Sequence, residues 1–452
     1  MNHVEKQRGR KGAADVLIFL LLLAGASAVT LILFYRQAMG EIPSDMKAYI
    51  LEMQGLDSGY SFPYPVFFRL AALLHLAVSP EMAVALAAVL LNGLAMAVTR
   101  LALNRLVLPW WEDTLLIRAL LSVLSVSLFF ISMLYTPGGI YLPGIHFRYL
   151  GVFTPNPFHN ATYMAARPFA ILAFLWYVKL LPLYEQGITD GTKRDYVLFS
   201  LFLFLATMTK PSFTLVMVST CGILMLYRLL RSGLRHFVPA LQLGLCFVPT
   251  FLALLYQYKG VFVPEGAEEG GVGFGFGEVW GQYCSLIPLA VCLALGFPLA
   301  VLVLNYKECG KNTLFRFSWM LYAVGFAEAF LLYEKGFRKP DFNFSWGYMY
   351  GIFFCHFGAL AVLLQATGRE WRKCIGAQKG EPGARESVSG KTGTLPENRG
   401  ILRGGRKIPL GDRRLSMGGR RILLGIQWAA YLCHVVCGIA YFLDYFGGSM
   451  YY

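Results

Sequence analysis

Residues 15–35 have the sequence DVLIFLLLLAGASAVTLILFY, in which one charged residue, Asp15, is followed by an uncharged and mostly apolar run. A helix needs about 20 such residues to cross the hydrocarbon core of a bilayer. The run continues beyond Ala26-Ser27-Ala28, a triplet that resembles a signal-peptide cleavage site. We therefore expect residues 15–35 to form an uncleaved first transmembrane helix.

The composition extends this expectation to the whole chain. Of the 452 residues, 56% are hydrophobic and only 15% are charged, which leaves too little polar surface for a soluble protein of this size. Because lipid cannot hydrogen-bond a bare backbone, the spanning segments must be helices or a closed barrel, and long apolar runs favour helices. The predicted fold is an all-α, polytopic transmembrane helix bundle.

Long apolar runs recur along the chain and predict about eleven transmembrane helices. They lie at residues 15–35, 80–104, 114–135, 162–183, 195–209, 212–231, 237–257, 280–305, 313–333, 346–366 and 422–446. The run at 195–209 is short, with a rise of only about 22 Å, and it ends at Lys210-Pro211. Residues 195–231 therefore either cross the membrane twice or form a re-entrant pair.

The apolar run from Pro63 to Val78 is too short to span and carries Arg69 and His75, so we expect a short helix along the outer interface. The charge distribution supports this topology. With a cytoplasmic N-terminus, cytoplasmic segments hold thirty of the forty Lys and Arg residues and outer segments hold ten. The prediction is a multi-pass protein of the cytoplasmic membrane whose C-terminus lies outside.

Three regions follow from this topology. Residues 1–366 form the membrane-embedded bundle, residues 367–421 form a basic, disordered cytoplasmic loop, and residues 422–452 form the last transmembrane helix with a short outer tail. The loop contains fourteen basic and five acidic residues, so it carries +9 of the chain's net charge of +14. Such a loop orients the protein and contacts anionic lipid heads, whereas nothing in it favours nucleic acid as a partner.

The first outer segment follows the first helix directly and has the sequence GEIPSDMKAY at residues 40–49. Asp45 is the candidate catalytic residue, because a desolvated carboxylate at the membrane surface can take a proton from a hydroxyl nucleophile. The alternative is that Ser44 or Asp45 only caps a short helix.

The second outer segment, residues 136–168, gathers polar residues that suit a phosphate group. The candidates are His146, Arg148, His159, Asn160 and Arg167. No His-x-x-x-His spacing is present, so a metal is the poorer interpretation. An arginine inside a spanning helix costs roughly 2.5–3.5 kcal/mol at mid-helix, so Arg167 either faces a partner or a cavity, or extends to the outer lipid headgroups.

The third segment places Lys210 between Thr209 and Pro211, where the proline interrupts a helix. Broken helices at membrane depth line cavities, and a lysine there offers a positive charge to an anionic ligand. The fourth segment, residues 334–347, mixes charge with aromatic rings that are also typical of the membrane interface. Its candidates are Glu334, Arg338 and Asn343. We expect the outer segments to converge on one outward-facing cavity.

Four features occur in a definite order: the early outer Asp45, the Tyr-Pro-led interface run from Pro63, the sequence NPFHN at 156–160 and the sequence TKPSF at 209–213. In this order of parts the chain resembles the GT-C class of membrane glycosyltransferases. The resemblance implies a GT-C-like bundle that transfers a sugar from a polyprenyl-phosphate donor to an envelope lipid, glycan or protein on the outer face.

By the same resemblance Asp45 would be the general base, and Arg167, Lys210, Arg338 or His159 would hold the donor phosphate. No Asp-x-Asp or Glu-x-Asp pair stands in the first outer segment, so we expect neither a divalent metal nor another cofactor. Two other functions remain open. A transporter or flippase for a lipid-linked anionic sugar would use the same basic cavity without a catalytic aspartate, and a non-catalytic assembly partner would need no cavity.

Overall fold

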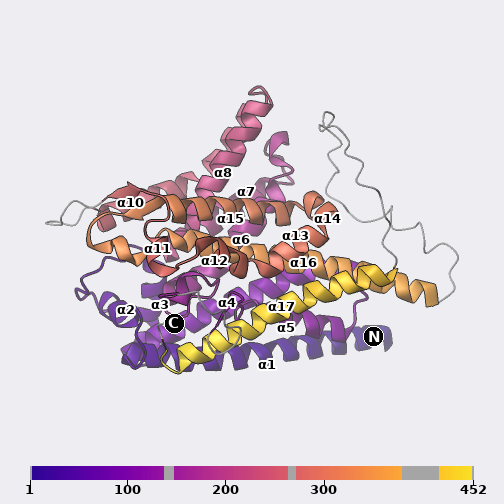
Figure 1. The fold of residues 1–452 in the computed structure, drawn as a ribbon, viewed down its shortest axis with the longest axis horizontal. Helices are drawn as coiled ribbons and strands as arrows, with labels where there is room; N and C mark the ends of the chain where they lie inside the picture. Colours follow the sequence, from indigo (N-terminus) through magenta and orange to yellow (C-terminus); the bar gives the residue numbers. More distant parts are fainter. Residues whose placement is uncertain (1–2, 137–146, 263–270, 379–416, 450–452) are drawn as a thin grey trace.

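The computed structural model describes residues 3–136, 147–262, 271–378 and 417–449, and most of these residues are helical (Figure 1). The longer helices are α1 (His3–Met39), α4 (Pro80–Val107), α6 (Ala161–Leu180), α7 (Lys193–Thr209), α8 (Ser212–Arg231), α15 (Thr313–Leu331), α16 (Ser345–Gln378) and α17 (Met417–Phe446). The shorter ones are α2 (Met46–Met53), α3 (Pro65–His75), α5 (Leu115–Ser127), α9 (Phe237–Leu245), α10 (Val248–Phe262), α11 (Trp280–Tyr283), α12 (Ile287–Ala294), α13 (Gly296–Leu304) and α14 (Tyr306–Lys311). One small antiparallel pair joins β1 (Val272–Phe274) to β2 (Leu332–Glu334).

Seven helices of the described ranges are long and apolar enough to cross a membrane: α1, α4, α6, α8, α15, α16 and α17. Two bent pairs, α9–α10 and α12–α13, raise this number to nine if each is one span, with bends of 48° and 70°. The most apolar stretch of α16 is completely buried, whereas that of α1 is mostly exposed. Helix α16 is therefore central and α1 peripheral, and the prediction of an all-α membrane helix bundle is confirmed.

Helix α7 has seventeen residues and lies alongside α6. At one end of the pair Lys179 of α6 forms a salt bridge of 2.7 Å with Asp195 of α7. At the other end Lys210, which follows α7, donates a hydrogen bond of 2.9 Å to Asn160, which precedes α6. The end of α6 thus contacts the start of α7, and the end of α7 contacts the start of α6. Helix α7 therefore runs antiparallel to α6 over its whole length.

The segment predicted as one helix over residues 114–135 is helical only to Ser127 in the structure. The following residues are buried, and their backbone groups bond to other elements. Asn156 donates to the carbonyls of Leu128 and Ile131, and the amide of Ser132 donates to the carbonyl of His434. Irregular backbone is tolerated in a membrane protein where the surrounding protein satisfies it, and this explains the early helix end.

The predicted loop of residues 367–421 is partly helical, because α16 continues to Gln378 and α17 begins at Met417. Glu370 accepts hydrogen bonds from Lys373 (2.7 Å) and Arg420 (3.0 Å), so an ion cluster joins the two extended helices. A boundary drawn from apolar composition missed this extension, because charged residues continue both helices. Residues 379–416 lie outside the described ranges.

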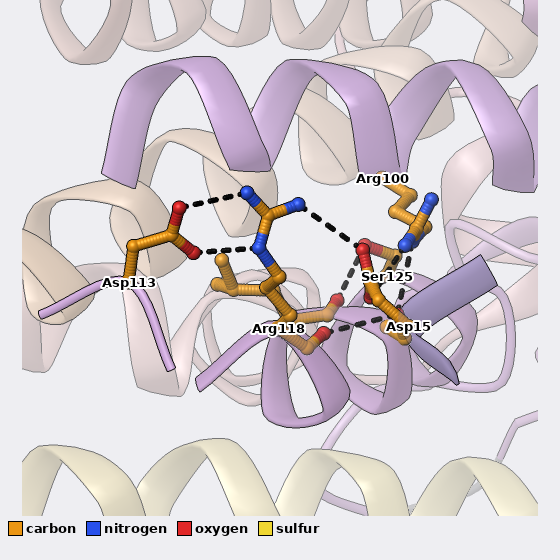
Figure 2. Close-up of polar contacts among 7 residues, drawn as sticks. Asp15, Arg100, Asp113, Arg118 and Ser125 are labelled. Atoms are coloured by element: carbon orange, nitrogen blue, oxygen red, sulfur yellow. Dashed lines mark hydrogen bonds and ion pairs between the residues drawn. The ribbon is translucent and has the colours of Figure 1, made fainter. Parts of the chain in front are cut away.

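A buried ion cluster joins α1, α4 and α5 near the N-terminus (Figure 2). Asp15 is 3% exposed, forms an ion pair with Arg100 at 2.6 Å and accepts a hydrogen bond from Arg118 at 3.2 Å. Arg118 lies between Asp15 and Asp113 and donates two hydrogen bonds, of 2.6 and 2.8 Å, to the Asp113 carboxylate. We call this end of the bundle the Asp15 end.

The opposite end is the Asp45 end, where α1 finishes and the short helices α2 and α3 lie (Figure 1). Helices α1 and α17 both run from the Asp15 end to the Asp45 end. The eleven residues of α3 rise only about 16 Å, so the run from Pro63 forms a short helix, too short to span the membrane.

Candidate functional site

A cavity of about 470 Å³ lies at the Asp45 end. Residues from α2, from the start of α6, from the break between α7 and α8, and from α10, α15 and the start of α16 line it. Six of the residues singled out in the sequence are among them: Asp45, His159, Asn160, Lys210, Glu334 and Asn343. Segments far apart in the chain thus contribute to one chamber.

Five side chains in this chamber form a continuous hydrogen-bond network, the Asp45 network: Asp45, Tyr49, Asn160, Thr162 and Lys210. Asp45 Oδ2 accepts from Asn160 Nδ2 at 2.7 Å and from the Tyr49 hydroxyl at 3.1 Å. Lys210 Nζ donates to Asn160 Oδ1 at 2.9 Å and to Thr162 Oγ1 at 3.3 Å. The hydroxyls of Tyr49 and Thr162 lie 3.1 Å apart. The carboxamide of Asn160 therefore bridges the negative and the positive group.

Local sequence explains how these groups are positioned. Asn160 is the N-cap of α6, and its Oδ1 accepts from the amide of Tyr163 at 3.0 Å, which fixes the carboxamide. Tyr49 follows Asp45 by four residues, the spacing that brings two side chains together on a helix. Asp45 occupies the N-cap position of α2 but makes no capping bond with its side chain. Instead, the amide of Met46 donates to Ser44 Oγ at 3.2 Å.

The groups around Asp45 shift its pKa in opposite directions. The protein around the cavity desolvates the carboxylate and raises its pKa, although the side chain is open to the chamber. The positive charge of Lys210 and the hydrogen bonds from Tyr49 and Asn160 act in the other direction and lower the pKa. The net pKa lies above the ordinary value of an aspartate. Asp45 is therefore a stronger base than a solvated aspartate.

Lys210 is only 8% exposed, and its ammonium lies 4.6 Å from the centre of the Trp346 ring. His159 contacts the same ring, with the ring centres 5.6 Å apart. Desolvation and the nearby Lys210 charge lower the pKa of His159 to about 3, so its imidazole is neutral near pH 7. Lys210 is then the cation of the Asp45 network, and His159 contributes a neutral ring.

Residues 334–347, the fourth candidate segment, line one side of the chamber. Trp346 Nε1 donates to Asn343 Oδ1 at 3.0 Å, and Asn343 Nδ2 donates to Glu334 at 2.8 Å. Glu334 ends strand β2, which pairs with β1. The ring that packs against Lys210 is thus held in place by a chain of side chains leading back to the β1–β2 pair.

Two predicted phosphate-binding residues do not line the cavity. Arg167 is 1% exposed, donates to Asn156 Oδ1 at 2.6 Å, and lies over the rings of Phe129, Tyr163 and Phe353 at 5.2–5.6 Å. Of the two alternatives for Arg167, a buried partner or the lipid headgroups, the structure shows a buried partner. This partner is the Asn156 amide, which also bonds the carbonyls that follow α5. Arg148 is exposed beside the Tyr283 ring.

The remaining two predicted residues are described less completely. His146 lies outside the described residues. Arg338 belongs to the 3-10 turn Gly336–Asp341, but the position of its side chain lies outside the described part of the structure. A contribution of either residue to the chamber therefore stays a prediction.

The lining or network residues that were not singled out from the sequence include Tyr49, Thr162 and Gln257. Tyr49 had a local signal, its four-residue spacing from Asp45 on a short helix. Thr162 stands two residues after the N-cap Asn160, and nothing in the sequence marks this position. Its role depends on the hydrogen bond from Lys210, a residue far along the chain. Gln257 lies inside an apolar run, and a lone glutamine there is a polar group in need of a partner.

Within the described ranges no group of three or more His, Cys, Asp or Glu side chains is arranged to hold a metal ion. Comparison with known proteins gives no match: no family model, no curated protein and no solved structure is similar to this chain. The function must therefore be inferred from the chamber itself.

Proposed function

We propose that the protein is a membrane glycosyltransferase of the GT-C type, which moves a sugar from a polyprenyl-phosphate donor to an envelope acceptor. The observation that carries the proposal is the Asp45 network, in which a carboxylate of raised pKa and a buried lysine share the carboxamide of Asn160. A base beside a cation is the pair that a transfer from a phosphate-linked sugar requires.

The chemistry assigns one role to each group. An acceptor hydroxyl gives its proton to Asp45 as its oxygen forms a bond to the anomeric carbon of the sugar. The bond between that carbon and the donor phosphate oxygen breaks, and its electron pair leaves with the polyprenyl phosphate. Lys210 stabilises the negative charge that grows on this phosphate. The proton, the sugar and the leaving group are thereby all accounted for.

An apolar groove of about 370 Å³ supports a lipid-linked donor. Leu215 of α8 and Leu254 of α10 line the chamber, and the next turns of the same helix faces line the groove. On α8 these are Val218, Gly222, Met225 and Leu229, and on the other side Phe251, Phe247 and Gly244. From Leu215 in the chamber to Leu229 in the groove, the lining follows about 21 Å of α8, so an isoprenoid tail would lie along it with its phosphate at Lys210.

The proposal includes a topology of eleven crossings. It counts the seven long helices, the two bent pairs, α7 beside α6, and α5 with the irregular residues that follow it. The distribution of thirty and ten basic residues then puts the Asp15 end in the cytoplasm and the Asp45 end outside. On this topology the chamber faces the outer leaflet, where lipid-linked sugars are used for envelope assembly.

Asp45→Asn tests the catalytic assignment. It keeps the size of the side chain but removes the base, so we expect transfer from a radiolabelled polyprenyl-phosphate sugar to fall by at least about 100-fold. Asp57→Asn is the matched control, because Asp57 is exposed and only turns the backbone through a 2.8 Å bond from the Gly59 amide. Wild-type turnover with full activity in Asp45→Asn would exclude Asp45 as the base. A wild-type protein that moves the lipid-linked sugar across vesicles without transferring it would be a flippase.

A further inference from the structure

The break between α7 and α8 leaves the Thr207 carbonyl without its helical partner. In a continuous helix the amide of residue 211 would donate to the carbonyl of Thr207, but Pro211 has no N–H. Gln257 of α10 fills this role, because its Nε2 donates to the Thr207 carbonyl at 2.9 Å. A side chain from another helix thus satisfies the backbone at the break.

This bond fixes the orientation of the Gln257 amide. A carbonyl oxygen can only accept, so the amide nitrogen must face Thr207 and Oε1 must point the other way. Gln257 is 3% exposed and lines the chamber, and no donor in the described part of the chain lies within hydrogen-bond reach of Oε1. A buried acceptor without a donor costs about 1–3 kcal/mol, which a ligand that supplies the donor would recover.

Glu328 of α15 lines the same chamber and adds further acceptor oxygens. Asp45 and Lys210 belong to one hydrogen-bond network, and neither Gln257 nor Glu328 is part of it. Besides the Asp45 network, the chamber therefore contains two further polar side chains, Gln257 and Glu328.

We propose that Gln257 Oε1 is a specificity-determining acceptor that receives a hydrogen bond from a hydroxyl of the sugar, while the donor phosphate sits at Lys210. This inference rests on the proposed function and assigns the sugar-binding part of its site. It follows from the Pro211 break, since the amide that satisfies the Thr207 carbonyl leaves Oε1 as a buried acceptor without a described donor, on a residue that lines the chamber.

Binding of two short-chain probes to the full-length protein tests the assignment. Citronellyl phosphate carries the phosphate alone, and citronellyl-phosphate hexoses (glucose, galactose and mannose in turn) add a sugar. Binding is followed by quenching of tryptophan fluorescence, because Trp346 lines the chamber. We expect at least one hexose probe to bind more tightly than the bare phosphate. Gln257→Met should weaken that probe about tenfold and leave the bare phosphate unchanged.

A second variant separates recognition from repair of the helix break. Pro211→Ala restores the N–H of residue 211, which reaches the Thr207 carbonyl when the helix continues through Lys210, so the double variant Gln257→Met/Pro211→Ala has a backbone donor for this carbonyl. The hexose-specific loss should persist relative to Pro211→Ala alone. Recovery of hexose binding in the double variant, or equal hexose binding by wild type and Gln257→Met, would overturn the assignment but leave the proposed function intact. Failure of the wild type to bind either probe would contradict both.

Discussion

Asn160 is the residue on which the chamber depends most directly, because its single carboxamide contacts both charged groups. Its Nδ2 faces the carboxylate and its Oδ1 faces the ammonium, so the two charges are held near each other by opposite ends of one amide. The N-cap bond to Tyr163 prevents this amide from turning. An aspartate at this position would keep the cap but place a second negative charge beside Asp45.

The raised pKa of Asp45 gives a pH prediction. The carboxylate acts as a base only above its pKa, so transfer should fall as the pH drops through that value. Lys210 lowers the pKa through its charge, and its removal should raise the pKa further. Lys210→Met should therefore reduce the maximal rate and also move the acidic limb of the pH–rate profile to higher pH.

Two controls make this shift specific. Lys47→Met removes an exposed lysine of α2 that lies outside the Asp45 network, and it should leave the limb in place. His159→Gln should also leave it in place, because a pKa of about 3 keeps that imidazole neutral over the measured range. An acidic limb that follows His159 instead of Lys210 would assign the titrating base to a different group.

Single residues could be predicted where a local rule applied. Asp45, Asn160 and Lys210 stand out in the sequence because a carboxylate, a cap and a lysine before proline are unusual in an apolar chain. Arg167 stands out equally, yet it lies in an aromatic cage away from the chamber. Sequence shows that a buried charge needs a partner, but only the packing of distant segments decides which partner it finds.

At the scale of elements, the groove between α8 and the α9–α10 pair predicts dependence on lipid length. An added Cβ at Gly222 would meet no atom within 4 Å, so a side chain at this position can extend into the groove. Gly222→Leu should slow transfer from a long polyprenyl donor several-fold and leave a citronellyl donor almost unaffected. The ratio of kcat/KM for the two donors measures the effect.

Gly425→Leu on α17 is the matched control for this substitution. Gly425 is exposed, an added Cβ there also meets no atom within 4 Å, and it does not line the groove. It should leave the ratio of the two donors unchanged. Equal losses with long and short donors in Gly222→Leu would mean that the tail does not lie in the groove.

The buried ion cluster of Figure 2 gives a stability prediction for the packing of α1, α4 and α5. Asp15→Leu would leave Arg100 buried without its carboxylate, at a cost of about 3–5 kcal/mol. Asp113→Asn affects a partly exposed pair and should cost about 1 kcal/mol or less. Thermal unfolding of the purified protein in detergent measures both changes.

The double variant Asp15→Leu/Arg100→Met removes both charges and should recover most of the lost stability, because it leaves no uncompensated arginine. If the double variant unfolds as early as Asp15→Leu, the loss came from altered packing rather than from the unpaired charge. Element boundaries were the part of the fold that sequence predicted least well here. The end of α5 depends on Asn156 and His434, which lie far along the chain.

At the scale of the whole molecule, apolar composition was sufficient to predict a helical membrane bundle, since lipid leaves the backbone few alternatives. The broken elements were harder to predict. The break at Lys210-Pro211 is visible because proline cannot continue the hydrogen bonding. The 70° bend between α12 and α13 is marked in a similar way by Gly296 and Pro298, since Pro298 has no N–H for the Ala294 carbonyl. His434 of α17 also supports this bend by accepting from the amide of Phe297 at 3.1 Å.

Orientation is the property of the whole molecule on which the proposed function depends, because the chamber must meet its substrates at the outer leaflet. On the proposed topology, thirty of the forty Lys and Arg residues belong to the side of the Asp15 end and ten to the side of the Asp45 end, which favours an Asp45 end that faces outward. α17 runs toward that end, so a reporter fused after Tyr452 should lie outside and one inserted after Gly390, in the basic segment, should lie inside. Alkaline phosphatase, which is active only outside the cytoplasm, should be active at the first position and inactive at the second, and green fluorescent protein should give the reverse. The opposite pattern would place the chamber in the cytoplasm and leave a donor on the outer leaflet without access to Asp45.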